Sequence, residues 1–390
     1  MCPTVLISDL TSDLSITTKE VTFFSSATLF TYGLMQLPSG LLADAFGGKK
    51  TIILLSILAG LSTLVFAFSS NLSVMTISRV ITGLSIAVTV PALVLLAHHF
   101  SARMYGRATS ILLSCGGLGS ILAAPPLIAL SSAFGWRYAM AFFGVLILVI
   151  AILIAVFVPK DSAEFHKKKV SVKDSLLGVK KVFSSLQFWP LALWAMFTIG
   201  THYMLASFWW GPYIMDGAGF SKKEVGIILT VAALTLVICQ PLLGYCSDVI
   251  FKARKIPLFV LSILGTISSF AMVLFTGEMT FPMLIVQTVF LIFGIALGSS
   301  VVFTMVKESF PLNIAGTATG CMTMLYPIWA AILQIVFGKV YTWALINNSP
   351  SQAMKIASWI IVANCVAAVI ACFFMKETFA GKASEPSGVV

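Results

Sequence analysis

Arg79 is the residue whose position in the sequence most directly indicates a role in binding or in holding a helix bundle together. It lies inside the apolar run 73–99, where a charged side chain is costly and normally faces a cavity or a partner. Three roles are open for it. The guanidinium could bind an anionic group of a small molecule, pair within a helix bundle that changes conformation, or donate to backbone carbonyls as a structural group. The first role would make the chain a binder of organic anions.

Polar and aromatic residues near the middle of the other apolar runs are the next candidates. Amides, hydroxyls and imidazoles surrounded by lipid need partners, so they turn toward the interior of a bundle. The residues that we expect to line an interior cavity with Arg79 are Tyr32, Gln36, His202, Tyr203, Trp210, Gln240, Gln287, Tyr326, Trp329 and Asn364. For Trp209, Trp210 and Tyr213, an aromatic belt at the outer membrane interface is an equally good interpretation.

Acidic residues are missing from the middle of the apolar runs. The acids near helix ends are Asp44, Asp248 and Glu308 beside basic loops, and Asp9, Asp13 and Glu20 at the opposite ends. We expect the second group to be solvated loop residues. Proton-coupled transport commonly uses a carboxylate inside the membrane. In a transporter, its absence would favour facilitated or exchange transport, unless His202 or an acid upstream of Met1 carried a proton.

These residues belong to a chain that is too apolar to fold in water. Of its 390 residues 59% are hydrophobic and 10% are charged, against about a quarter charged in a soluble domain. This composition excludes a soluble enzyme, a disordered protein and a nucleic-acid-binding protein. The formal net charge of +10 is typical of lysines and arginines that orient a membrane protein. No Walker loop, HExxH motif or nucleophile elbow occurs, so we expect no enzyme activity, cofactor or metal.

Apolar segments long enough to cross a bilayer follow one another along the chain. The predicted spans are 19–44, 49–69, 73–99, 105–132, 137–158, 187–215, 222–247, 256–276, 280–308, 315–345 and 352–375. Basic residues gather in every second connection. By the positive-inside rule, these connections and the C-terminus are cytoplasmic.

The spans form two groups with a basic linker between them. The predicted division is an N-terminal half over 1–158, a linker over 159–186, a C-terminal half over 187–376 and a tail over 377–390. Apolar residues at helical spacing in the linker predict an amphipathic helix. It could lie on the inner leaflet or pack as a cytoplasmic helix, and both interpretations are open.

A repeated sequence pattern relates the two groups of spans. Residues 36–44 (QLPSGLLAD) match residues 240–248 (QPLLGYCSD), which indicates a duplicated six-helix unit, an architecture of transporters. Two such units need twelve helices, but eleven complete ones are predicted. Residues 1–10 look like the outer end of the first helix. We therefore expect the native protein to begin upstream of Met1, or the chain to be a truncated form.

Residues 40–50 (GLLADAFGGKK) resemble the signature loop of the major facilitator superfamily between its second and third helices. Arg79 and Gly83 resemble the fourth-helix motif of that family. The resemblance implies two six-helix halves that alternate access to a midplane cavity, with a latch that closes the cytoplasmic side. The gating residues that it implies are Gly40, Asp44, Gly47, Lys49 and Lys50, with Asp248 and Arg254 in a degenerate second copy.

These features predict an all-α polytopic membrane protein with the fold of this family, in two pseudo-symmetric halves. We expect a secondary active or facilitative transporter of a small polar organic solute. Arg79 and His202 favour an organic acid, an amino acid or a short peptide. A sugar or sugar-phosphate transporter is the alternative, as is a non-transporting sensor or truncated inactive relative. We expect a monomer in the bacterial inner membrane, with the lipid bilayer and a small molecule as partners and no nucleic acid. A coupling proton or ion is left open.

Overall fold

The computed structural model describes residues 2–14, 16–99, 112, 115–116, 119, 126–159, 172–310 and 312–379. This part of the chain is helical and contains no strand. Within it, nine helices are long and apolar enough to cross a membrane. Their outward faces expose large apolar side chains such as Ile152, Phe157 and Phe373, as expected for a surface that meets lipid. The predicted all-α polytopic membrane fold is confirmed.

The N-terminal helices correspond closely to the predicted spans. They are α1 (Cys2–Leu14), α2 (Thr18–Phe46), α3 (Gly48–Phe68), α4 (Leu72–Ser85), α5 (Thr89–His99) and α7 (Trp136–Phe157). The span predicted over 105–132 lies largely outside the described residues, and residues 126–134 are helical.

The span predicted as one helix over 73–99 is interrupted near its middle. The first part, α4, ends at Ser85, and α5 begins at Thr89. Pro91 explains the break, because it has no N–H to donate to the carbonyl of Ala87, and its ring clashes with that carbonyl.

The C-terminal helices also follow the predicted spans, with five π-helical segments inserted into them. The elements are α8 (Val172–Phe183), α9 (Phe188–Ala195), η2 (Met196–Gly200), α10 (Thr201–Met204), η3 (Leu205–Trp209), α11 (Trp210–Pro212), η4 (Tyr213–Gly217), α12 (Lys222–Tyr245), η5 (Cys246–Phe251), α13 (Lys255–Leu274), α14 (Phe281–Ile292), η6 (Phe293–Leu297), α15 (Ser299–Ser309), α16 (Leu312–Ala344) and α17 (Pro350–Phe374). Proline lies inside α2, α12 and α16, which helices in a bundle tolerate.

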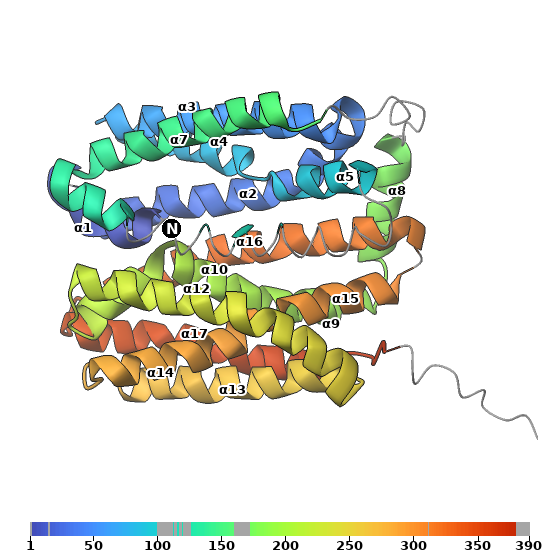
Figure 1. Ribbon diagram of the computed structural model, residues 1–390. Helices are drawn as coiled ribbons and strands as arrows, with labels where there is room; N and C mark the ends of the chain where they lie inside the picture. The colour runs from blue at the N-terminus through green and yellow to red at the C-terminus, as the bar shows by residue number, and fades with distance from the viewer. Residues whose placement is uncertain are drawn as a thin grey trace, which may run out of the picture.

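The N-terminal and C-terminal helices form two bundles that lie side by side, and α2 and α16 meet between them (Figure 1). A Cβ atom at Gly33 would lie 2.8 Å from Ile328, and one at Gly338 would lie 3.3 Å from Thr22. These positions show that α2 and α16 run antiparallel in close contact over much of their length. Small residues permit this approach, as is usual between membrane helices.

The linker helix α8 lies across the ends of the two bundles (Figure 1). Its Val182 is fully buried, and a Cβ atom at Gly178 would lie 3.4 Å from Thr317 of α16. This packing accords with the interpretation of α8 as a cytoplasmic helix. Leu177 and Leu186 are exposed, so a contact with the inner leaflet stays open as well.

Candidate functional site

Three tyrosines form a cluster where the two bundles meet. Tyr32 from α2 stacks on Tyr203 from α10, with ring centroids 6.4 Å apart. Tyr203 in turn contacts Tyr326 from α16 at 5.2 Å. Gln36 is buried one turn after Tyr32, and its amide interacts with the Tyr32 hydroxyl. Four of the predicted cavity residues therefore come together from both halves, and their hydroxyl and amide groups could bind a polar small molecule.

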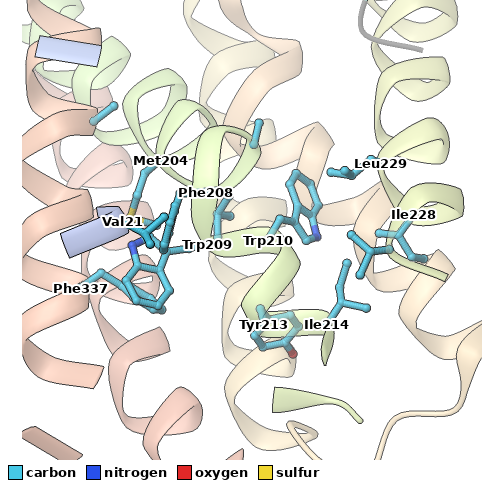
Figure 2. Packing of buried hydrophobic residues seen from close by; sticks show 14 of the residues in the cluster. Val21, Met204, Phe208, Trp209, Trp210, Tyr213, Ile214, Ile228, Leu229 and Phe337 are labelled. Carbon is cyan, nitrogen blue, oxygen red and sulfur yellow. The ribbon is translucent and has the colours of Figure 1, made fainter. Parts of the chain in front are cut away.

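His202 lies next to this tyrosine cluster. Its ring is 6.0 Å from that of Tyr203 and 6.4 Å from that of Trp210. Trp209 and Trp210 point to opposite sides of their helix, Trp209 toward Phe337 and Trp210 toward Leu229 (Figure 2). Both tryptophans and Tyr213 are at most 1% exposed. The alternative interpretation of these three residues as an aromatic belt at the lipid interface is therefore wrong.

Arg79 is buried in the N-terminal bundle and is 6% exposed. Its guanidinium carbon lies 3.6 Å from the centroid of the Phe66 ring, which is a cation–π contact. One turn further along α4, a Cβ atom at Gly83 would collide with Thr28 and Thr31 of α2. Because Thr31 directly precedes Tyr32, Arg79 lies within about one or two helical turns of the tyrosine cluster in depth.

The other predicted cavity residues pair within the C-terminal bundle. Gln240 donates to Ser299 over 2.7 Å, which joins α12 to α15. The indole of Trp329 donates to Asn364 over 3.0 Å, which joins α16 to α17. Gln287 exchanges longer contacts with Ser268, between α13 and α14. A groove of about 240 Å³ lies between α3 and α4, but its lining is almost entirely apolar and largely exposed, so it suits lipid better than a polar solute.

The helix that carries His202 and Tyr203 contains three π-helical segments, η2, η3 and η4. Such segments are rare and occur frequently at functional sites. Each one widens a helical turn and so shifts the register of the residues that follow. The hydropathy of residues 187–215 gives no sign of these segments, because hydropathy does not report local hydrogen-bond register.

The signature loop joins α2 to α3 through glycines. Gly47 has φ of +94°, a conformation that favours glycine, and a Cβ atom at Gly48 would lie 2.7 Å from the carbonyl oxygen of Pro91. Gly40 approaches Val90 of α5. Asp44 belongs to α2, but its side chain lies outside the described part of the structure. These positions agree with a tight, closely packed turn.

The two lysines of this loop have different surroundings. Lys49 donates to the carbonyls of Ala155 and Val158 over 2.8 and 2.6 Å, and these carbonyls end α7. A cation at this point stabilises the helix C-terminus. Lys50 is exposed. Lys49 thus joins α3 to the end of α7 within the N-terminal bundle. A gating role for it stays a prediction.

Arg254 is the centre of a polar cluster at the corresponding end of the C-terminal bundle. Its guanidinium pairs with Glu308 at 3.2 Å and donates to Ser247 over 3.1 Å. The backbone N–H groups of Arg254 and Lys255 donate to Glu377 over 2.8 and 3.1 Å. Glu377 thereby caps the N-terminus of α13 from a distant part of the chain. The side chain of Asp248 lies outside the described residues.

The cap at Glu377 predicts a pH dependence. Burial raises the pKa of this carboxyl group, but four backbone N–H bonds outweigh burial and bring the pKa below 4.5. Stabilisation by the charged cap is therefore complete above pH 4.5 and is lost as the pH falls through the folded-state pKa. We expect Glu377→Gln to lower the free energy of unfolding near pH 7 by at most about 1 kcal/mol, because the group is exposed.

Thermal unfolding of the wild type and Glu377→Gln between pH 7 and pH 3 measures this effect. The difference between the two proteins should shrink as the pH falls below 4.5. A difference that stays constant over this range would show that the charged form of Glu377 is not the source of this stabilisation.

A pair of opposite charges that the sequence did not predict joins the bundles at the end opposite the basic loops. Asp9 of α1 lies 2.6 Å from Lys222 of α12 and also accepts from Ser131. The expectation that Asp9 is a solvated loop residue is therefore wrong. Asp13, by contrast, pairs with Arg137 within the N-terminal bundle at 3.1 Å. Opposite charges at helix ends were visible in the sequence, but their pairing across the two halves was not.

Asp9→Asn and Lys222→Gln should each loosen this end of the molecule. We expect the free energy that favours the state closed at this end to fall by about 1 kcal/mol. This corresponds to a roughly fivefold shift toward a state open at this end. Distances between spin labels at Ala133 and Lys223, measured by pulsed electron paramagnetic resonance, report the shift. Asp13→Asn is the matched control and should leave the distances unchanged. Equal distances in the wild type and Asp9→Asn would contradict the prediction.

The chain is similar to known transporters in sequence and in fold. The sequence model of the Major Facilitator Superfamily matches residues 1–334. A probable sulfoacetate transporter of Cupriavidus necator is 25% identical over 353 residues, which cover 84% of this chain and 79% of that protein. A probable galactarate/D-glucarate transporter of Escherichia coli is 24% identical over 369 residues, covering 85% and 81%. The structure of a D-xylose–proton symporter superposes with a TM-score of 0.78 at 14% identity, over 98% of this chain and 95% of that one, which shows a shared fold.

Proposed function

Since the chain belongs to the major facilitator superfamily, we propose that it transports a small organic anion across a membrane by alternating access. Arg79 is the group that binds a carboxylate or sulfonate of the cargo. The membership makes the chain an integral multi-pass membrane protein of a transporter family. The nature of the cargo and the role of Arg79 are the parts that we propose.

The buried guanidinium of Arg79 carries this proposal. Arginine is always charged in proteins, and its planar fork fits a carboxylate or sulfonate through two parallel hydrogen bonds. The ring of Phe66 contacts the cation from one side, which offsets a small part of the cost of burying it. Burial strengthens such an interaction, because water screens it less.

The names of the relatives support an acidic cargo. Sulfoacetate, galactarate and D-glucarate, which the two relatives are described as transporting, are all anions that carry carboxylate or sulfonate groups. Two of them also carry several hydroxyl groups. The hydroxyl and amide groups of Tyr32, Gln36, Tyr203 and Tyr326 could hydrogen-bond to such a cargo from both halves.

The charge pattern supports an orientation with the basic loops, α8 and the C-terminal tail in the cytoplasm. In this orientation the Asp9–Lys222 pair closes the outer side. We infer a bacterial inner membrane and a monomer, as expected for a transporter whose cavity lies between the two halves of one chain.

A thermal-shift screen of the purified protein tests the cargo class. The probes are sulfoacetate and D-glucarate, with D-glucitol as a neutral compound of the same carbon skeleton as D-glucarate. A ligand at 100 times its dissociation constant stabilises the folded state by about 2.7 kcal/mol. We expect at least one acid to raise the unfolding temperature and D-glucitol to have no effect. Stabilisation by D-glucitol without stabilisation by the acids would refute an anionic cargo.

A further inference from the structure

The middle of the C-terminal half contains one side chain of the type that ordinarily titrates near neutral pH in water, the imidazole of His202. The acids of residues 187–379 lie at helix ends or beyond: Asp216, Glu224, Asp248, Glu278, Glu308 and Glu377. His202 is the only histidine of residues 187–376, and it lies near the middle of the span Phe188–Gly217. Imidazole is the side chain whose ordinary protonation changes between pH 5 and 8.

The surroundings of His202 leave one ring nitrogen available. Its Nδ1 atom is buried and has no hydrogen-bond partner among the residues that the structure describes. A buried polar atom without a partner is costly and calls for an explanation, such as a ligand or a functional role. The ring lies beside Tyr203, which contacts Tyr32 of the other half. His202 is therefore adjacent to a residue that contacts the other half.

In the part of the chain that the structure describes, the elements packed against the helix of His202 do not supply a compensating negative charge. Its helix α10 packs on η2, η3, η6 and α16. The titratable groups of these elements and of the adjoining tyrosine cluster are Tyr32, Tyr203, Cys321, Tyr326, Lys339 and Tyr341. Lys339 is exposed, and the tyrosines and the cysteine ordinarily titrate well above pH 7. A positive charge on His202 would consequently lack an anionic partner in these elements.

We propose that His202 binds a proton that is transported together with the organic anion, which makes the protein a proton symporter. This inference rests on the proposed function, because an anion in the cavity is what offsets the imidazolium charge. The proton comes from the outer solution, forms an N–H bond on the imidazole, and returns to water on the cytoplasmic side. Since each charge makes the other less costly to bury, the proton and the anion bind cooperatively.

Reconstituted vesicles separate this inference from the proposed function. D-glucarate and sulfoacetate are each tested in two modes: exchange at equal pH, and net uptake into vesicles that are less acidic inside. One proton per anion, without a membrane potential, converts one pH unit into an about tenfold accumulation. We expect the wild type to perform both modes and His202→Gln to retain exchange but lose the accumulation. A pH-sensitive dye inside the vesicles should report proton entry with the acid in the wild type alone.

His99→Gln is the matched control, because His99 is exposed at the end of α5 and the chemical change is the same. This variant should retain both modes. Accumulation retained in His202→Gln, no proton entry with the acid in the wild type, or loss of exchange as well in a folded His202→Gln variant would each overturn the inference. Absence of acid exchange in the wild type would instead refute the proposed function, and the inference with it.

Discussion

Arg79→Gln is expected to weaken the binding of D-glucarate or sulfoacetate by about a hundredfold or more. Removing one member of a buried, hydrogen-bonded charge pair costs about 2–5 kcal/mol, because the other charge is left without its partner. Arg79→Lys retains the charge but loses the planar fork, so we expect a smaller loss, roughly tenfold. Isothermal titration calorimetry of the purified variants measures both effects.

Phe66→Leu is the control for this series. It removes the ring that lies 3.6 Å from the guanidinium but leaves the charge in place. The variant should lose stability, because Phe66 also packs against Phe24 and Trp136, while its affinity for the acid stays within a few-fold of the wild type. Unchanged affinity in a folded Arg79→Gln variant would show that Arg79 acts in structure or gating rather than in binding.

Gly294→Ala is expected to produce the largest loss of stability. An added Cβ atom would lie 2.0 Å from the Cα atom of Gly265 and 2.5 Å from its nitrogen. Backbone atoms cannot rotate away, so α13 and η6 would have to separate. Overpacking in a tight core commonly costs 1–3 kcal/mol, and we expect about 3 kcal/mol or more here.

Thermal unfolding in detergent measures this loss, and Gly244→Ala is the matched control. A Cβ atom at Gly244 would meet nothing within 4 Å, so alanine there should be neutral or slightly stabilising. If Gly294→Ala unfolded at the temperature of the wild type, the close approach of α13 and η6 would be contradicted.

Composition and periodicity were enough to predict the helices and the class of protein. An apolar run near 20 residues long is a property of one helix and needs no knowledge of its neighbours. The turn at Gly47 was predicted for a similar local reason, and its positive φ agrees. The break before Thr89 was also within reach, since Pro91 and its missing N–H are visible in the sequence.

The arrangement of the candidate site was less predictable. Tyr32, Tyr203 and Tyr326 were each selected for their depth in the membrane, but their meeting depends on how α2, α10 and α16 pack across the two halves. Gln240 was selected by the same rule and instead pairs with Ser299. Depth in the membrane thus identifies polar residues that must find partners, but it does not distinguish partners within a bundle from a cargo.

Exchange of labelled acid in vesicles that contain the purified wild-type protein tests the central claim most directly. Vesicles are loaded with unlabelled D-glucarate or sulfoacetate and diluted into a trace of the same labelled acid. An anion transporter exchanges the two pools, so we predict rapid accumulation of label that unlabelled D-glucitol inside the vesicles does not support. Exchange of labelled D-glucitol together with no exchange of either acid would contradict the account.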